Sequence, residues 1–209
     1  MIDTLIFDLD GTLLDTSDGI WKSVIDTVNH FSMEPINSDQ MSKFIGPPII
    51  ESFRDYYGIS DEKSREMMYY FRNNYVDCHL FEAKPYPEID VVLENLAKNY
   101  KLYVATNKRE DYANTILQYF DLKKYFKSIH GTDYDNKLSK TDLISLCMDE
   151  ASSTKGSTVM IGDTIGDKKS AEQMGVKFIG VGYGFGNMGG TGIVRLPSDI
   201  PLAIMEIDY

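Results

Sequence analysis

The fold is decided by residues 4–16, TLIFDLDGTLLDT, in which a short apolar run ends abruptly at two aspartates. Thr4–Phe7 is typical of a parallel strand that is buried on both faces of a sheet. Asp8 and Asp10 follow at once, and two carboxylates at a strand end are costly unless they hold a cation or transfer protons. The stretch therefore predicts a buried strand with a chemically active end.

The same short apolar pattern recurs along the chain, separated by helical patterns. Further strands are expected at residues 102–105, 159–161 and 176–181, with a weaker candidate at 128–130. Apolar residues at helical spacing predict helices at residues 88–99, 110–120 and 141–151. Because such alternation implies right-handed βαβ units, the expected fold class is α/β with a Rossmann-like parallel sheet.

A helical insert interrupts this alternation between residues 16 and 81, where no good strand is found. Four helix starts are indicated, by Thr16 or Ser17, by Ser38–Asp39, by Pro47–Pro48 and by Asp61–Glu62. We therefore expect residues 15–82 to form a four-helix domain, set into a core made of residues 1–14 and 83–209.

The composition limits the classes of function. The formal net charge of −11 and the pI of about 4.7 argue against a nucleic-acid partner or an anionic membrane surface. They do not exclude a small anionic substrate, since a few fixed cations and a bound metal can invert the local field. Neither a secretory signal nor an apolar run of about 20 residues is evident, so a cytoplasmic protein is expected.

Two polar segments after predicted strands suit an anion. Thr106 and Asn107 offer a hydroxyl and an amide to phosphate oxygens, although the same pair is ordinary turn chemistry. Lys140 lies at the start of a predicted helix, where its charge opposes the helix dipole but would help to bind an anion. Lys137 is the competing candidate for this role.

A further acidic pair, Asp163 and Asp167, flanks a strand-to-helix turn in IGDTIGD. Few carboxylates and several waters are the ligands that Mg²⁺ prefers, and one carboxylate can bind directly while the other orients the shell. Together with Asp8, Asp10 and Lys140, this pair fits phosphoryl transfer. Asp8 would attack in line, and Asp10 would protonate the leaving oxygen and then activate water.

The four segments DLDGTLLDT, VATNK, Lys140 and GDTIGD, in this order, resemble the motifs of the haloacid-dehalogenase-like phosphatase superfamily. The resemblance implies a sheet of order 5-4-1-2-3 with Asp8 on its central strand, and it identifies the insert as an α-helical cap. It also implies Mg²⁺ ligation by Asp8, Asp163, Asp167 and the backbone carbonyl of Asp10. Thr106, Asn107 and Lys140 would bind phosphate.

Substrate selectivity is expected to reside in the helical insert. The segment KFIGPP at residues 43–48 resembles a cap loop of the phosphoglycolate-phosphatase-like branch, and Lys43 and, more weakly, Arg72 and Arg54 are candidates to contact the substrate. The glycine-rich segment Gly184–Gly190 departs from that branch. We interpret it as a surface turn, with a mobile loop near the site as the alternative.

Several functions remain open. A small phosphate monoester such as phosphoglycolate is the first expectation, and pyrophosphate and nucleotide monophosphates are alternatives. A phosphosugar mutase of the β-phosphoglucomutase kind would use the same core, and a catalytically idle binding module would use the same fold. A dehalogenase is disfavoured, because that chemistry typically lacks a carboxylate at the position of Asp10. Oligomeric state cannot be inferred from the sequence.

Overall fold

The computed structural model describes residues 1–135, 137–186 and 193–208. Two compact units are formed, one by Met1–Asp15 with Pro85–Tyr209 and the other by Thr16–Lys84. The sequence placed these divisions after residues 14 and 82. We refer to the first unit as the core and to the second as the helical unit.

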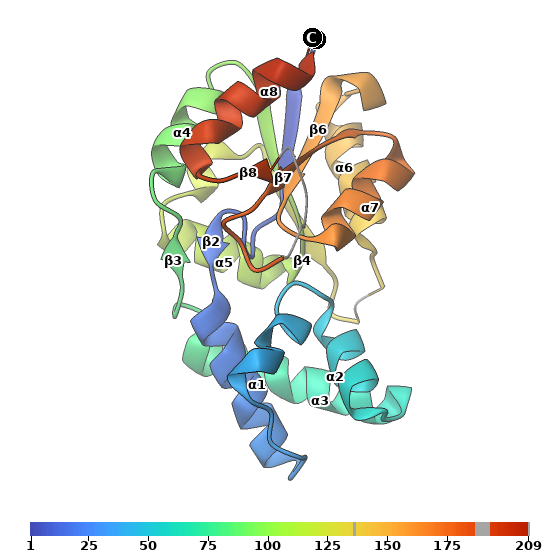
Figure 1. Ribbon diagram of the computed structural model, residues 1–209. Coiled ribbons are helices and arrows are strands. Elements are labelled where there is room, and N and C mark those ends of the chain that lie inside the picture. The colour runs from blue at the N-terminus through green and yellow to red at the C-terminus, as the bar shows by residue number, and fades with distance from the viewer. Residues whose placement is uncertain (136, 187–192, 209) are drawn as a thin grey trace. The chain divides into compact units, whose positions relative to one another are not determined.

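A parallel sheet of six strands forms the centre of the core, in the order β5-β4-β1-β6-β7-β8 (Figure 1). Its strands are β1 (Thr4–Phe7), β4 (Lys101–Arg109), β5 (Ser128–Thr132), β6 (Thr158–Gly162), β7 (Lys177–Val181) and β8 (Ile193–Val194). When β1, β4, β5, β6 and β7 are numbered 1 to 5 along the chain, the sheet read from β7 to β5 has the order 5-4-1-2-3. The predicted strand order is therefore confirmed. The short β8 was not expected, and β2 (Leu14–Asp15) pairs with β3 (Lys84–Pro85) in a separate two-stranded sheet.

Helices cover both faces of the sheet, as its continuous apolar strands require. They are α4 (Ile89–Leu96), α5 (Glu110–Tyr119), α6 (Lys140–Ala151), α7 (Ile165–Met174) and α8 (Ile200–Asp208), with short 3₁₀ turns η3 (Lys123–Tyr125), η4 (Lys155–Ser157) and η5 (Pro197–Asp199). Figure 1 shows α4 and α8 on one side of the sheet and α6 and α7 on the other. Between the sheet and α6, buried side chains such as Ile6, Met160 and Leu143 form a continuous hydrophobic cluster.

The helical unit contains helices at the four expected places. They are α1 (Ser17–His30), η1 (Ser38–Lys43), α2 (Ile49–Tyr57) and α3 (Asp61–Asn74), and α3 continues into a π-helical turn, η2 (Tyr75–His79). Phe53, Met67 and Met68 are fully buried and form part of its core. The predicted second helix is wrong in extent, because it is a 3₁₀ helix that ends at Lys43 rather than near Gly46.

The cap of that second helix was also misassigned. Asn37, rather than Ser38 or Asp39, is the N-cap residue, and its side chain accepts a hydrogen bond from the backbone N–H of Asp39 at 3.2 Å. Gln40 accepts the backbone N–H of Asn37 in return, at 3.1 Å. This reciprocal capping box satisfies donors that a helix start leaves unpaired, and it places Ser38 and Asp39 within the first turn.

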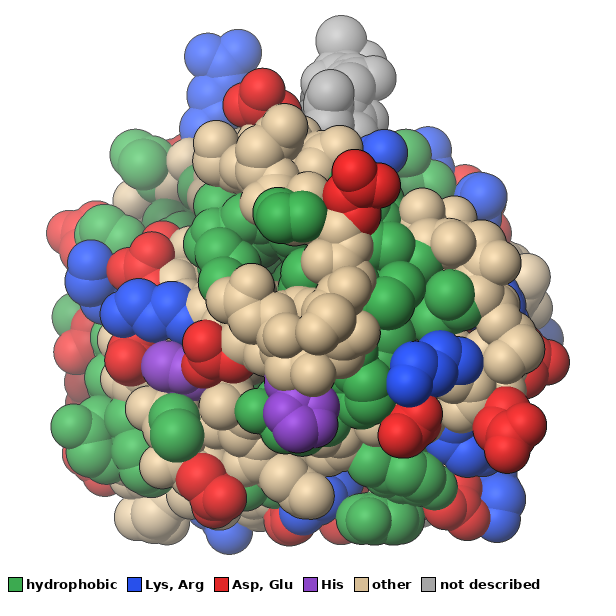
Figure 2. Space-filling model, turned by 90° about the horizontal axis from the view of Figure 1, so that it is seen from below, with side chains coloured by type: hydrophobic (Ala, Val, Ile, Leu, Met, Phe, Trp, Pro, Cys, Tyr) green, Lys and Arg blue, Asp and Glu red, His purple; other side chains and the backbone are tan. Residues whose placement is uncertain are grey.

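Charged side chains of both signs are interspersed on the face shown in Figure 2, where basic residues form no continuous stripe. Within the described parts of the chain, none of the helices combines the length and the apolar character that a membrane span would need.

We expect Leu143→Ala to lower the free energy of unfolding of the core by about 2–5 kcal/mol, because Leu143 is fully buried between α6 and the sheet. Leu146→Ala is the matched control, since Leu146 lies on the same helix but is 39% exposed, and a change of about 0.5 kcal/mol or less is expected. Urea denaturation followed by circular dichroism measures both, and equal effects would contradict this packing.

Candidate active site

The polar segments meet because they follow neighbouring parallel strands. Strand β1 lies between β4 and β6, with Phe7 in register with Val104 on one side and Ile161 on the other. Asp8 follows β1 directly, and its backbone N–H donates to the carbonyl of Ile161 at 2.9 Å. The carboxyl ends of three adjacent strands thus form one edge of the sheet, where open α/β folds bind ligands.

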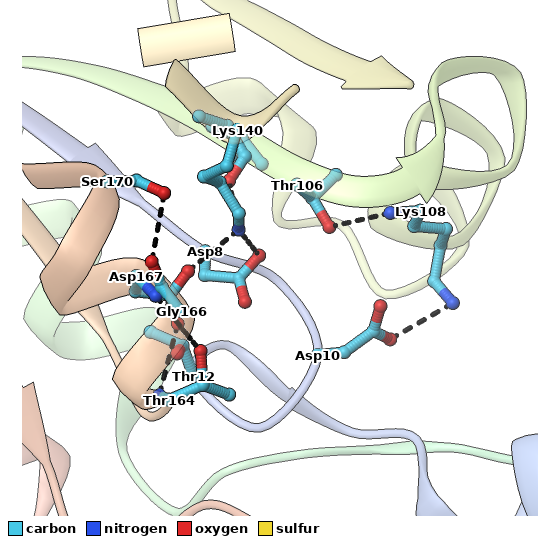
Figure 3. Close-up of polar contacts among 12 residues, drawn as sticks. Asp8, Asp10, Thr12, Thr106, Lys108, Lys140, Thr164, Gly166, Asp167 and Ser170 are labelled. Atoms are coloured by element: carbon cyan, nitrogen blue, oxygen red, sulfur yellow. Dashed lines mark hydrogen bonds and ion pairs between the residues drawn. The ribbon is translucent and has the colours of Figure 1, made fainter. Parts of the chain in front are cut away.

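Lys140 is the cation at this edge (Figure 3). It is the first residue of α6, whose start is fixed by a capping box between Ser139 and Asp142. Its Nζ atom lies 2.8 Å from Asp8 Oδ1 and 2.9 Å from Asp167 Oδ1, and it donates to the carbonyl of Ala105 at 3.0 Å. A buried ammonium needs this compensation, and it receives it from two carboxylates and a carbonyl.

Lys137, the competing candidate, lies elsewhere. Its side chain is 71% exposed and pairs with Asp135 at 2.7 Å. Of the two lysines, only Lys140 therefore lies among the aspartates.

Three buried carboxylates, those of Asp8, Asp163 and Asp167, have ligand atoms within 4.8 Å of one another. When all are ionised, the three carboxylates outnumber the one ammonium, that of Lys140, which contacts two of them. Burial raises the pKa of Asp8, an effect that Lys140 opposes and that the charges of Asp167 and Asp163 reinforce. Oxygen donors with this excess of negative charge fit a hard divalent cation.

Asp163 is held by a loop that follows β7. The backbone N–H groups of Phe185 and Gly186 donate to Asp163 Oδ2 at 2.8 and 3.1 Å, and Thr12 Oγ1 lies 3.5 Å from Oδ1. Burial and the charge of Asp167 raise the pKa of Asp163 to about 6, while these backbone donors oppose the rise. The carboxylate is therefore fixed in direction by backbone groups on one side.

The interpretation of Gly184–Gly190 as a surface turn is wrong for residues 184–186, and residues 187–190 lie outside the described parts of the chain. A Cβ atom on Gly184 would lie 2.2 Å from the carbonyl oxygen of Gly11 and 2.5 Å from Asp163 Cβ. A Cβ atom on Gly186 would lie 2.0 Å from the carbonyl oxygen of Asp163. Glycine is needed at these two positions because the backbone approaches its neighbours too closely for a Cβ atom. The sequence could have indicated this, since the segment comes just after a predicted strand that ends at the same edge of the sheet as Asp8.

Thr106 and Asn107 lie at the end of β4, where the strand departs from regular pairing with β5. Thr106 is 1% exposed, and its Oγ1 accepts a hydrogen bond from the backbone N–H of Lys108 at 3.2 Å. Asn107 is the next residue and is partly exposed. Both are therefore on the strand next to Asp8.

Asp10 points away from the carboxylate cluster towards Lys108 (Figure 3). Lys108 Nζ lies 3.0 Å from Asp10 Oδ1, and the Lys108 side chain is 5% exposed. Sequence reasoning missed Lys108, although it quoted the segment VATNK that contains it. A lysine after a turn reads as a surface residue, and only the folded chain shows it buried beside Asp10.

The candidate selectivity residues fall in different settings within the helical unit. Lys43 lies 5.1 Å over the ring of Tyr56, beside a cavity of about 410 Å³. The cavity is lined by Lys43, Pro47, Glu51, Ser52, Asp55 and Tyr56. Arg72 is 5% exposed on α3, and Arg54 pairs with Asp55 at 2.8 Å.

Comparison with known proteins identifies the family. Residues 5–181 match the family described as haloacid dehalogenase-like hydrolase. The 5'-nucleotidase of Pseudomonas aeruginosa is 34% identical over 185 residues, covering 88% of this chain and 84% of that protein. The phosphoglycolate phosphatase of Aquifex aeolicus is 30% identical over 200 residues, covering 94% of this chain and 89% of that protein. A solved structure described as a predicted phosphatase from Clostridium acetobutylicum is 34% identical, has a TM-score of 0.93 and matches over 99% of both chains.

The chain therefore belongs to the haloacid dehalogenase-like hydrolase family. The resemblance seen in the sequence is confirmed, as is the expectation of an enzyme of the phosphatase class within this family.

The raised pKa of Asp163 predicts a pH-dependent stability of the metal-free protein. Because the pKa rises from 3.8 to about 6 on folding, its stabilising contribution is fully present below about pH 4 and is lost as the pH rises through about 6. In EDTA, Asp163→Asn should therefore raise the Tm relative to wild type at pH 7, and this advantage should vanish near pH 4. Thermal denaturation across pH measures this, with exposed Asp77→Asn as the control. A Tm difference that does not change with pH would contradict the assignment.

Proposed function

We propose that this protein is a Mg²⁺-dependent phosphatase that hydrolyses a small phosphate monoester through a phospho-aspartyl intermediate on Asp8. The observation that carries the proposal is the contact of buried Asp8 with Lys140, 2.8 Å away, beside two further buried carboxylates. A nucleophilic carboxylate, a fixed cation and a divalent-metal site are what the attack on a phosphate dianion requires.

In this mechanism a carboxylate oxygen of Asp8 attacks phosphorus, and the bond from phosphorus to the ester oxygen breaks. Asp10 gives its proton to the departing oxygen, so that an alcohol leaves. Asp10 then takes a proton from water, whose oxygen attacks the phosphorus of the aspartyl-phosphate. Asp8 is released as a carboxylate together with inorganic phosphate, and Asp10 is protonated again.

The remaining residues hold and neutralise the phosphate. Lys140 balances the charge of Asp8 and of the phosphate oxygens, and Thr106 and Asn107 donate to those oxygens. Asp8, Asp163, Asp167 and the backbone carbonyl of Asp10 would hold Mg²⁺. When bound, the cation would neutralise negative charge that develops on the transferred group.

For the substrate we propose a small phosphorylated metabolite, with phosphoglycolate as the first candidate. The names of the relatives from Aquifex aeolicus and Pseudomonas aeruginosa support phosphoglycolate and nucleoside monophosphates respectively. Lys43, beside its cavity, and Arg72 are the proposed selectivity residues of the helical unit. A screen of phosphate esters and pyrophosphate with Mg²⁺ distinguishes these substrates. Conversion of glucose-1-phosphate in the presence of a bisphosphate activator would indicate a phosphosugar mutase. The absence of turnover with every phosphate ester would indicate a binding module.

Asp8→Asn should lower kcat by at least about a thousandfold, since loss of a nucleophile typically has an effect of this order or larger. Steady-state release of inorganic phosphate measures the change, and the Tm should show that the variant is folded. Mass spectrometry of acid-quenched wild type should find a phosphoryl group on the peptide that contains Asp8. Asp77→Asn is the control, and substantial activity in Asp8→Asn would refute the nucleophile.

Removal of divalent cations should abolish turnover, and Mg²⁺ should restore it. Independently of activity, Mg²⁺ at about 100 times its Kd should stabilise the folded wild-type protein by about 2.7 kcal/mol. Asp163→Asn should lose most of this stabilisation, because a carboxylate of the cluster is removed. Thermal shift at constant ionic strength measures the effect, and indifference of both activity and Tm to EDTA would remove the metal from the scheme.

A further inference from the structure

Lys108 and Asp10 form a buried ion pair that none of the steps above uses. The two atoms that meet are Lys108 Nζ and Asp10 Oδ1, 3.0 Å apart, and the side chains are 5% and 14% exposed. An ammonium withdrawn from water to this extent needs an acceptor, and Oδ1 of Asp10 can accept from it whether the carboxyl group is ionised or carries a proton on its other oxygen. The ion pair therefore restricts the conformation of both side chains. The effect is larger for Asp10, because its short side chain has few other rotamers.

The position of Lys108 is built into the strand. Thr106 of β4 is in register with Gly131 of β5, but the next pair is Arg109 with Thr132, so that Asn107 and Lys108 are extra residues in a bulge. A Cβ atom on Gly131 would lie 2.5 Å from the carbonyl oxygen of Lys108, so glycine permits the bulge. Bulges of this kind re-aim side chains at the ends of strands.

We propose that Lys108 is a positioning residue for Asp10. By donating to Oδ1, the ammonium fixes the plane of the carboxyl group, so that in the acid form the proton is carried on Oδ2, towards the ester oxygen that departs from phosphorus. This inference rests on the proposed function, in which Asp10 is the proton donor. It assigns Lys108 no contact with the phosphate or with the metal.

If Lys108 positions Asp10, the effect of losing Lys108 should depend on how basic the leaving group of the substrate is. An alkyl phosphate must expel a strongly basic alkoxide, so proton transfer from a well-oriented acid speeds its cleavage. p-Nitrophenyl phosphate expels a weakly basic phenolate that leaves without this help. Loss of orientation at Asp10 should therefore slow alkyl esters far more than the nitrophenyl ester, whereas a general loss of folding or of metal would slow both equally.

The experiment compares kcat/KM, which reports the steps up to formation of the aspartyl-phosphate, for two substrates: p-nitrophenyl phosphate and the best alkyl phosphate of the screen whose alcohol group carries no charge. Lys108→Met and Lys108→Gln should lower kcat/KM for the alkyl ester at least about tenfold more than for the nitrophenyl ester. Lys108→Arg should restore part of the loss. Lys98→Met is the control and should change neither value, because Lys98 is exposed and its ammonium donates to the nearby Asn95.

A double-mutant cycle sharpens the test. In an Asp10→Asn background, Lys108→Met should have little further selective effect on the alkyl ester, because the group that it positions is gone. Equal losses for both esters, or a selective loss that persists with Asp10→Asn, would overturn the positioning role while leaving the phosphatase assignment intact. A wild-type protein that cleaves no phosphate ester would instead overturn the proposed function, and this inference with it.

Discussion

The site depends on one electrostatic constraint: the carboxylates of Asp8, Asp163 and Asp167 are buried close together, and the ammonium of Lys140 contacts two of them. Lys140 contacts both Asp8 and Asp167, and Asp163 completes the acidic cluster. Like charges at this separation are unfavourable in a medium of low polarity, and the raised pKa of Asp163 reflects that burial. In the proposed mechanism a divalent cation would relieve this repulsion, so the arrangement that destabilises the metal-free core would favour binding of the cation.

The surrounding backbone is shaped to maintain this arrangement. Capping boxes begin α6 at Ser139 and α7 at Thr164, and Asp167 Oδ2 accepts from the backbone and hydroxyl of Thr164 at 3.1 and 2.6 Å. Glycines at 11, 184 and 186 allow backbone segments to approach Asp163 more closely than a Cβ atom would permit. The carboxylates are thus directed by hydrogen bonds and close packing, which limits the reorganisation that binding requires.

Sequence patterns predicted the core well where they carry a local physical signal. The apolar runs of β1, β4, β6 and β7 and the helices between them appear near the expected positions, because burial on both faces selects continuous apolar strands. The weak candidate at 128–130 is also a strand. The predicted second helix of the insert was less accurate, since Asn37 and Gln40 cap each other reciprocally and neighbouring Ser38 and Asp39 gave a competing signal.

The sequence alone determined the α/β class and the helical insert, and it predicted the aspartates of the candidate site with Lys140 and Lys137 as candidate lysines, because specific motifs at strand ends report on chemistry and on position together. Only the tertiary structure distinguished Lys140 from Lys137, turned Asp10 towards Lys108 and placed Gly184–Gly186 against Asp163. These relations join residues that are far apart in the chain or lie in an irregular bulge. They depend on burial and on close backbone approach, which hydrophobic periodicity and turn propensity do not encode.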